Sequence, residues 1–406
     1  MESVRVNLFR KAAIPVLAVL VALFTKCGMQ GELGLLPEQP EHLFLVRVLG
    51  VDKSSLGEGL LRITMEGSGP TLAVGPGEPA SGKVPYIISM DGHSVYDISQ
   101  RIDTTSDLDI HWGHISFLVV GEDIAKEDIN KCIDMMMREH EARTSIIIFV
   151  AYGSTAEEMI KKSNTSGFLF HERLEQLVQM AGEYSVSAKV PLYRFADMLS
   201  SDTCAAYAPC LIPAEYVYNT AEMDKDKQGI NLNGFAVFKD GRLAGYMLNE
   251  VARGFNFAIG KVKSTSIVVK DTLGSNVTLE VINSQANIKP LITDGKPSVT
   301  LEVSFQTNIA DLQSTRSIFT ERELDRLRLA QEEEVKKEVQ SAVNYCKSLD
   351  ADILDFLGAF HRTCTVEWEK MRGDWDRIFP ALDVNIIIRS EIKRTYTIRE
   401  PAGGKE

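Results

Sequence analysis

The chain has few cysteines, fewer basic than acidic residues, and no apolar run of bilayer-spanning length. Six cysteines in 406 residues are too few for a disulfide scaffold. With 44 Lys and Arg against 56 Asp and Glu, the net charge of −12 argues against a nucleic-acid binder, which needs a basic face. The apolar run at residues 12–24 reaches about 20 Å as a helix, short of the ~30 Å hydrocarbon core. A multi-span membrane protein is therefore excluded, and the ordinary composition excludes wholesale disorder.

Motifs for catalysis and cofactor binding are also missing from the sequence. It has no G-x-G-x-x-G after a strand pattern, no G-x-S-x-G and no H-E-x-x-H. Gly77–Lys83 has the spacing of a phosphate-binding loop, but Val84 stands where a magnesium-binding Ser or Thr is required. His111 and His114 lack further ligands for a metal, and we interpret them as core or loop histidines. We therefore expect a non-enzymatic protein without a metal or cofactor.

The first 26 residues are typical of a secretory signal. Basic residues at positions 5, 10 and 11 precede the apolar run Ala12–Phe24, and a polar pair follows it. We predict a signal peptide over residues 1–26 and export of the remaining chain. An uncleaved N-terminal membrane anchor is the alternative.

Cys27 follows this segment directly, at the place of the lipidated cysteine of a bacterial lipoprotein. Its thiol would carry a diacylglycerol group, and two or more acyl chains hold a protein on a bilayer at about 0.8 kcal/mol per buried methylene. Lipoproteins usually have Leu three positions before the cysteine and a small residue directly before it, whereas this chain has Phe24 and Lys26. We predict a covalent lipid on Cys27, with Lys26 as the main departure from the pattern.

Hydrophobic periodicity divides the exported chain into three mixed α+β domains, at residues 27–200, 201–292 and 293–406. In the first domain, strand patterns such as residues 115–120 alternate with helical patterns, which predicts crossover connections and a mixed or parallel sheet. We expect Asp123 to cap one helix that continues to Met137. Gly182 is expected to end another helix in the left-handed conformation.

The middle domain is predicted to contain a hairpin. Strand patterns at residues 232–238 and 243–246 flank Asp240-Gly241, which is a strong signal for a two-residue turn. Further strand patterns near residues 265–269 and 277–282 are expected to continue this sheet.

The last domain has the clearest pattern. A long strand pattern at residues 299–309 precedes Thr320–Glu323, a capping box that opens a helix running to about Leu349. A second strand pattern covers residues 384–398. We expect the helix to cover one face of a sheet.

Two features have two interpretations each. Cys204 and Cys210 either close a disulfide loop, which export would allow, or remain separate buried thiols. An aromatic stripe at helical spacing indicates core packing, with a partner-binding or membrane-facing surface as the alternative. It consists of Trp368, Met371, Trp375 and Phe379.

Several short segments carry, in order, the motifs of one known family. They are Trp112–Ala125, Arg138–Arg143, Val150–Gly153, Gly234–Lys239, Asp352–Leu354, Trp368 and Trp375–Phe379. The ordered set resembles the Ger(x)C (GerAC-like) spore germination lipoproteins, the C subunits of nutrient germinant receptors in endospore-forming bacteria. Members usually begin Cys-Trp-Asp, whereas this chain has Cys27-Gly28-Met29.

The resemblance implies three mixed α+β domains outside the membrane and no catalytic residues. It also implies a role beside the integral-membrane A- and B-type receptor subunits, one nutrient-sensing and one transporter-like. We therefore expect a lipid-anchored receptor subunit on the extracytoplasmic face of the spore inner membrane, acting through protein–protein contacts. The alternative is an extracytoplasmic lipoprotein that binds a small molecule, which would need a cleft between two lobes.

Overall fold

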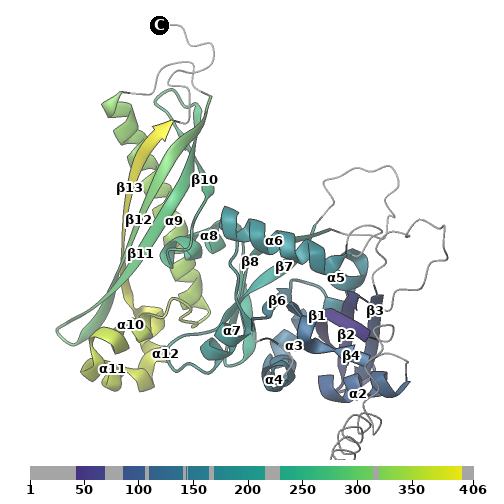
Figure 1. Ribbon diagram of the computed structural model, residues 1–406. Coiled ribbons are helices and arrows are strands. Elements are labelled where there is room, and N and C mark those ends of the chain that lie inside the picture. Colours follow the sequence, from purple (N-terminus) through teal and green to yellow (C-terminus); the bar gives the residue numbers. More distant parts are fainter. Residues whose placement is uncertain are drawn as a thin grey trace, which may run out of the picture.

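The structure is a computed structural model that describes residues 43–68, 86–105, 109–139, 143, 145–163, 169–214, 229–313 and 320–395. The predicted signal segment, Cys27 and the loop Gly77–Lys83 lie outside these residues. The described residues form two sheets with helices packed on them, which is the predicted α+β class (Figure 1). No helix among them combines the length and apolar character that crossing a membrane requires.

In the described part of the chain, the first sheet has nine strands and a parallel centre. Strands β1, β5, β6 and β7 are parallel to one another, and antiparallel strands extend both edges. The order is β3 (Tyr86–Gly92), β2 (Leu61–Ser68), β1 (Leu43–Lys53), β5 (Phe117–Val120), β6 (Ile147–Ala151), β7 (Tyr207–Ala214), β8 (Gly229–Lys239) and β9 (Arg242–Met247), with β4 (Asp109–His111) beside β1. This arrangement confirms the predicted mixed sheet with crossover connections.

Alternate residues of the central strands belong to two different cores. Val119 and Phe149 join a cluster with α5 and α6, whereas Leu118 and Val150 join a cluster with α2, α3, α4 and α7. Both faces are therefore covered, which explains why β5 and β6 are continuous apolar runs. The helices are α2 (Val95–Thr105), α3 (Glu122–Glu127), α4 (Asn130–Arg138), α5 (Ala156–Ser163), α6 (Phe170–Tyr184) and α7 (Leu192–Leu199), with the short turn η3 (Trp112–His114) before β5.

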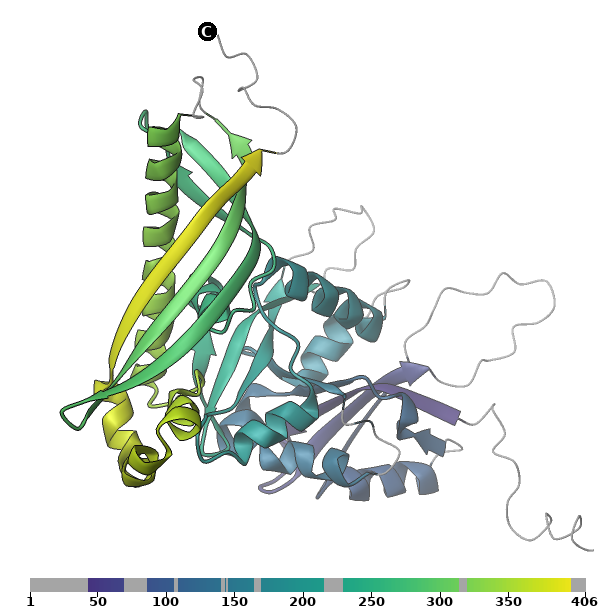
Figure 2. The same cartoon turned by 60° about the vertical axis from the view of Figure 1, so that its left-hand side comes forward.

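The second sheet contains four strands among the described residues, and a long helix lies along one face of it (Figure 2). Its strands, in spatial order, are β10 (Thr265–Lys270), β11 (Asn276–Thr293), β12 (Lys296–Leu312) and β13 (Asp383–Thr395). Because β12 and β13 are parallel, the chain must cross over between them. The crossover contains α9 (Glu321–Ser348), α10 (Phe356–Thr363), α11 (Thr365–Met371), η4 (Arg372–Asp374), α12 (Trp375–Ile378) and η5 (Phe379–Ala381).

Helix α9 begins at the predicted cap. The backbone N–H of Glu323 donates to the Thr320 hydroxyl at 3.3 Å. The Glu323 carboxylate, however, accepts from the backbone N–H of Thr272 at 2.9 Å. This second bond ties the start of α9 to the β10–β11 connection.

Helix α8 (Asn249–Ala258) joins the two sheets. The ring centroid of Phe255 lies 5.2 Å from that of Phe235 on β8 and 5.0 Å from that of Tyr207 on β7. Two residues later, Phe257 lies 5.5 Å from Phe305 on β12. One hydrophobic cluster therefore extends from the first sheet into the second.

The helix predicted from Asp123 to Met137 is interrupted. Gly121, not Asp123, is the N-cap residue of α3, and α3 ends before an extended Asp128 with φ of −168°. The backbone N–H of Ile129 then donates to the Gly241 carbonyl at 2.9 Å. Contact with the β8–β9 hairpin thus divides a segment whose periodicity is continuous.

The prediction for Gly182 is wrong. Helix α6 continues to Tyr184, and Ser185 adopts the left-handed conformation with φ of 58°. Two tertiary hydrogen bonds hold Ser185: its hydroxyl accepts from the backbone N–H of Lys263 at 3.0 Å, and its carbonyl accepts from the Asn256 amide at 2.7 Å. These bonds offset the strain of a non-glycine residue at positive φ.

The Asp240-Gly241 hairpin is confirmed, with φ of 50° and 74° at the two turn residues. Strands β10 and β11, however, pair with each other, and β11 pairs with β12 in the second sheet, so the expectation that they continue the sheet of this hairpin is wrong. The first sheet takes strands from both sides of the predicted boundary at residue 200, and the boundary at residue 292 falls within β11.

Candidate functional site

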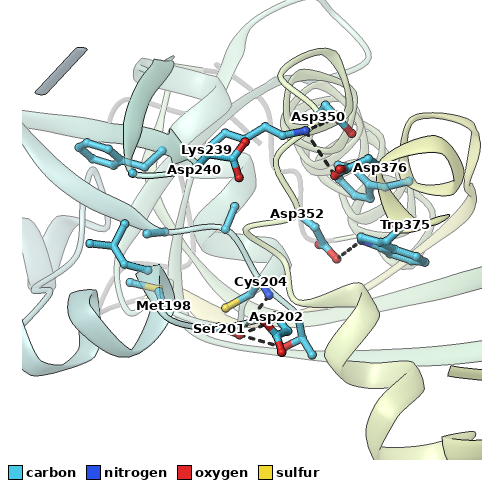
Figure 3. Close-up of a pocket in the computed structure, with 17 residues that line it drawn as sticks. Met198, Ser201, Asp202, Cys204, Lys239, Asp240, Asp350, Asp352, Trp375 and Asp376 are labelled. Carbon is cyan, nitrogen blue, oxygen red and sulfur yellow. Dashed lines mark hydrogen bonds and ion pairs between the residues drawn. The ribbon is translucent and has the colours of Figure 1, made fainter. Parts of the chain in front are cut away.

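A cavity of about 200 Å³ lies where the first sheet meets the C-terminal helices (Figure 3). Four segments far apart in the sequence line it: the stretch from α7 to β7, the tip of the β8–β9 hairpin, the α9–α10 connection, and α12 with η5. Lys239, Asp352, Trp375 and Phe379, which belong to the motifs found in the sequence, all reach this cavity.

Lys239 connects the hairpin tip to the C-terminal helices. Its ammonium group forms ion pairs with Asp350 and, at 3.4 Å, with Asp376. Burial lowers the pKa of Lys239, but the pairing with Asp350 and Asp376 together outweighs this, and the net pKa is raised. Lys239 is therefore a stable cation, and it holds two carboxylates that would otherwise repel each other.

Asp352 is a buried carboxylate at the start of α10. It accepts from the backbone N–H groups of Phe356 at 3.1 Å and Leu357 at 2.9 Å, and from the Trp375 indole at 3.2 Å. Desolvation by burial outweighs these hydrogen bonds and raises its pKa to about 7. One side chain thus satisfies orphan N–H groups of one helix and positions another.

Asp52 has the same role on the first sheet. It follows the parallel part of β1 and accepts from the backbone N–H groups of Ala156 at 2.7 Å and Glu157 at 2.9 Å, at the start of α5. Desolvation raises its pKa to about 6. Sequence reasoning missed Asp52, because nothing in its local pattern distinguishes it from a surface aspartate, whereas Asp352 was noted only as part of a motif.

The histidine and cysteine candidates do not form a reactive centre in the described part of the chain. The rings of His111 and His114 lie 5.4 Å apart, and no group of three His, Cys, Asp or Glu residues there is placed to hold a metal ion. Cys204 lines the cavity, whereas Cys210 lies in β7 and its thiol donates to the Asn233 carbonyl at 2.8 Å. Both thiols are free, and burial raises the pKa of Cys210 to about 12, so the alternative of two separate thiols holds in this structure.

The aromatic stripe is core, as interpreted. Trp368, Met371, Trp375 and Phe379 are all buried, with exposed fractions between 1% and 9%. Trp368 also stacks on His361, with ring centroids 4.1 Å apart. The guanidinium carbon of Arg372, four residues further along the chain, lies 5.2 Å from the centroid of the Trp368 ring. The stripe packs α10, α11 and α12 together rather than offering an apolar surface.

The described residues that line the cavity connect distant segments of the chain. Its ionisable groups are five aspartates, one lysine and one thiol whose pKa is raised by burial. A nucleophile beside a general base, as covalent catalysis requires, is not found among these lining residues. The sequence motifs contain Lys239, Asp352 and Asp376, but sequence reasoning missed Asp350 and the pairing of Lys239 with Asp350 and Asp376, which lie 111 and 137 residues away.

Two family descriptions match the chain in succession. The "Spore germination protein N-terminal domain" matches residues 38–213, and "Spore germination B3/GerAC like, C-terminal" matches residues 233–396. Together they cover most of the chain, which therefore belongs to the GerAC-like family of spore germination proteins.

Individual relatives agree with this assignment. Spore germination protein KC of Bacillus subtilis is 22% identical over 97% of this chain and 98% of its own length. Spore germination protein B3 of the same organism is 22% identical over 79% of this chain and 83% of its own length. The crystal structure of the GerBC protein covers 85% of this chain and 96% of its own, with a TM-score of 0.52 and 17% identity, which establishes a shared fold.

Proposed function

We propose that this protein is the lipid-anchored C-type subunit of a nutrient germinant receptor, and that it acts by contact with integral-membrane A- and B-type subunits. The observation that carries the proposal is the succession of both family regions along the chain, together with a relative named spore germination protein KC that matches over nearly its whole length. We further propose that the role is non-enzymatic. The cavity supports this proposal, because Lys239 there forms ion pairs with Asp350 and Asp376 from other segments.

Membrane attachment is proposed through Cys27. An acylated cysteine after an exported leader would hold the domains on the extracytoplasmic face of the spore inner membrane. Confinement to this thin layer raises the effective concentration of the domains toward membrane partners, so weak contacts suffice for assembly. No resident cofactor is proposed.

Intact mass of the membrane-extracted protein tests the attachment. The wild type is expected to begin at Cys27 and to carry a diacylglyceryl mass increment, and the Cys27→Ala variant is expected to lack it. Lys26→Ala should raise the processed fraction, because the processing site favours a small residue before the cysteine. A full-length leader without added lipid would instead support the uncleaved anchor.

Partner recovery tests the role in assembly. Tagged wild-type protein from detergent-solubilised spore membranes should bring down integral-membrane receptor subunits, and Cys27→Ala should bring down less. A specific, saturable rise in thermal midpoint with an amino acid or a sugar would favour the alternative of a small-molecule-binding lipoprotein.

A further inference from the structure

A second cavity, of about 340 Å³, lies at the amino ends of β5 and β6. Its charged lining residues are mainly basic, whereas those of the first cavity are mainly acidic. Backbone hydrogen bonds hold the segments that line this cavity side by side. Ser116 N–H donates to the Arg47 carbonyl at 3.0 Å, and Ile147 N–H donates to the Ser116 carbonyl at 2.9 Å. Beyond them, Ile148 N–H donates to the Val190 carbonyl at 3.3 Å, which places Lys189 at the same edge.

Basic side chains from four separate segments line this cavity: Arg47, His114, Arg143 and Lys189. Glu175 is the one acidic residue among the described lining residues, and it pairs with Arg47 at 2.8 Å. No ion pair joins Arg143 or Lys189 to a described carboxylate. With neutral histidine, the lining carries three positive charges and one negative, in a chain whose net charge is −12.

Arg47 has unused hydrogen-bonding capacity at this place. One terminal nitrogen donates to Glu175, while its Nε is buried and has no hydrogen-bond partner in the described part of the chain. A buried donor without an acceptor is unfavourable, and like charges gathered in one cavity repel each other. A bound anion would relieve the repulsion between the like charges.

We propose that this cavity binds a phosphate group, either as free phosphate or in the headgroup of a lipid. The planar guanidinium groups of Arg47 and Arg143 match the oxygens of a phosphate, and the ammonium of Lys189 adds a third cationic donor. A dianionic phosphate would balance the local charge. The cavity volume exceeds what a phosphate and several waters need, at about 30 Å³ per water.

The position of the cavity along the chain makes a lipid headgroup accessible. Arg47 is only 20 positions after Cys27, and such a segment spans at most about 70 Å when fully extended. The headgroup source rests on the proposed membrane attachment, whereas binding of free phosphate does not. The intact-mass experiment on Cys27 and the binding experiment below therefore fail independently.

Calorimetric titration of the full chain in a neutral detergent tests the proposal. Inorganic phosphate is titrated against sodium chloride of equal ionic strength. The wild type is expected to show saturable binding, and Arg143→Gln/Lys189→Gln at least about tenfold weaker binding, since charge-assisted hydrogen bonds are lost. Both replaced residues are exposed, so folding should be retained. The control Lys336→Gln/Lys337→Gln removes the same charge from an exposed face of α9 and should bind like the wild type.

A second measurement distinguishes the two sources of phosphate. Native mass spectrometry in micelles doped with phosphatidylglycerol should show lipid adducts that Arg143→Gln/Lys189→Gln loses and the control keeps. Saturable binding of inorganic phosphate indicates the free anion, and adducts without such binding indicate the headgroup. The proposal is overturned if neither probe binds, or if the two double variants lose binding equally.

Discussion

Gly121 and Gly182 differ in whether a side chain fits at their position, which their sequence contexts do not reveal. A Cβ at Gly121 would lie 1.9 Å from Oδ1 of Asp52, whereas a Cβ at Gly182 would meet nothing within 4 Å. Asp52 cannot move aside without losing its two bonds to the start of α5. Gly121 is therefore required by a buried carboxylate, and Gly182 by no contact that the structure describes.

Gly121→Ala should destabilise the protein by about 3 kcal/mol, because overpacking and loss of buried hydrogen bonds act together. Gly182→Ala, the matched control within α6, should gain about 0.5–1 kcal/mol through lower backbone entropy of the unfolded chain. Urea unfolding of the two variants measures both effects. Equal stability of the two variants would contradict this account of Gly121.

Asp352 gives stability a specific pH dependence. Its pKa is about 7 in the folded protein against 3.8 for the unperturbed group, so the folded state binds the proton more tightly. The contribution of Asp352 to stability is full below pH 4 and is lost as the pH rises toward 7, by at most about 4 kcal/mol. Asp352→Asn should therefore flatten the fall in unfolding free energy across this interval.

The control for Asp352 is Asp374→Asn, which removes an exposed carboxylate nearby and should leave the slope unchanged. Asp52 titrates in the same direction, with a pKa of about 6, but it is present in both variants and cancels in the comparison. Asp352→Asn also loses one of the two backbone hydrogen bonds, which shifts stability by a constant amount at every pH. An unchanged slope in Asp352→Asn would refute the assignment.

At the scale of elements, α8 and α9 are joined by a close backbone approach and a buried ion pair. A Cβ at Gly254 would lie 2.1 Å from the Glu338 carbonyl oxygen, so the helices pack without a side chain between them. The neighbouring Arg253 donates through Nε to Glu338 at 2.9 Å and through a terminal nitrogen to the Ser266 carbonyl on β10 at 2.9 Å. Arg253 thus connects two helices and a strand.

Removal of Arg253 alone should be more harmful than removal of the pair. Desolvation raises the pKa of Glu338 even with Arg253 present, which shows how strongly its site disfavours an unpaired charge. Arg253→Met should lose about 3–5 kcal/mol, and Arg253→Met/Glu338→Met should recover much of this loss. A double-mutant cycle of thermal midpoints measures the coupling. Additive losses would show that the two side chains do not interact.

The elements themselves could largely be predicted, and the exceptions have tertiary causes. Alternation of apolar and polar residues identified β12, the Asp240-Gly241 turn identified the β8–β9 hairpin, and Thr320 identified the start of α9. The break between α3 and α4 depends on a bond from Ile129 to the hairpin, which no local pattern encodes. Assignment of β10 and β11 to the second sheet likewise depends on pairing partners, not on their own periodicity.

At the scale of the whole molecule, contacts between distant segments hold the two sheets together. The hairpin tip bonds to Ile129 on one side and forms ion pairs with Asp350 and Asp376 on the other. Helix α8 adds an apolar connection through Phe255 and Phe257. Sequence motifs marked Lys239 and Asp352 individually, but their meeting in one cavity required the fold.

We propose that this protein acts in germination while bound to the membrane beside its receptor partners. Family membership gives the biological process, while the lipid on Cys27 and the partners are proposals. On the proposed role in receptor assembly, loss of the subunit should impair responses that depend on its own receptor and spare others. A selective loss of nutrient responses distinguishes the loss of one receptor from a general defect in spore formation.

The most direct test is the germination rate of spores that lack the gene, measured across a panel of nutrients. The account predicts a slower response to at least one nutrient, restored by the wild-type gene and restored poorly by Cys27→Ala. A normal response to every nutrient in the deletion strain would contradict it.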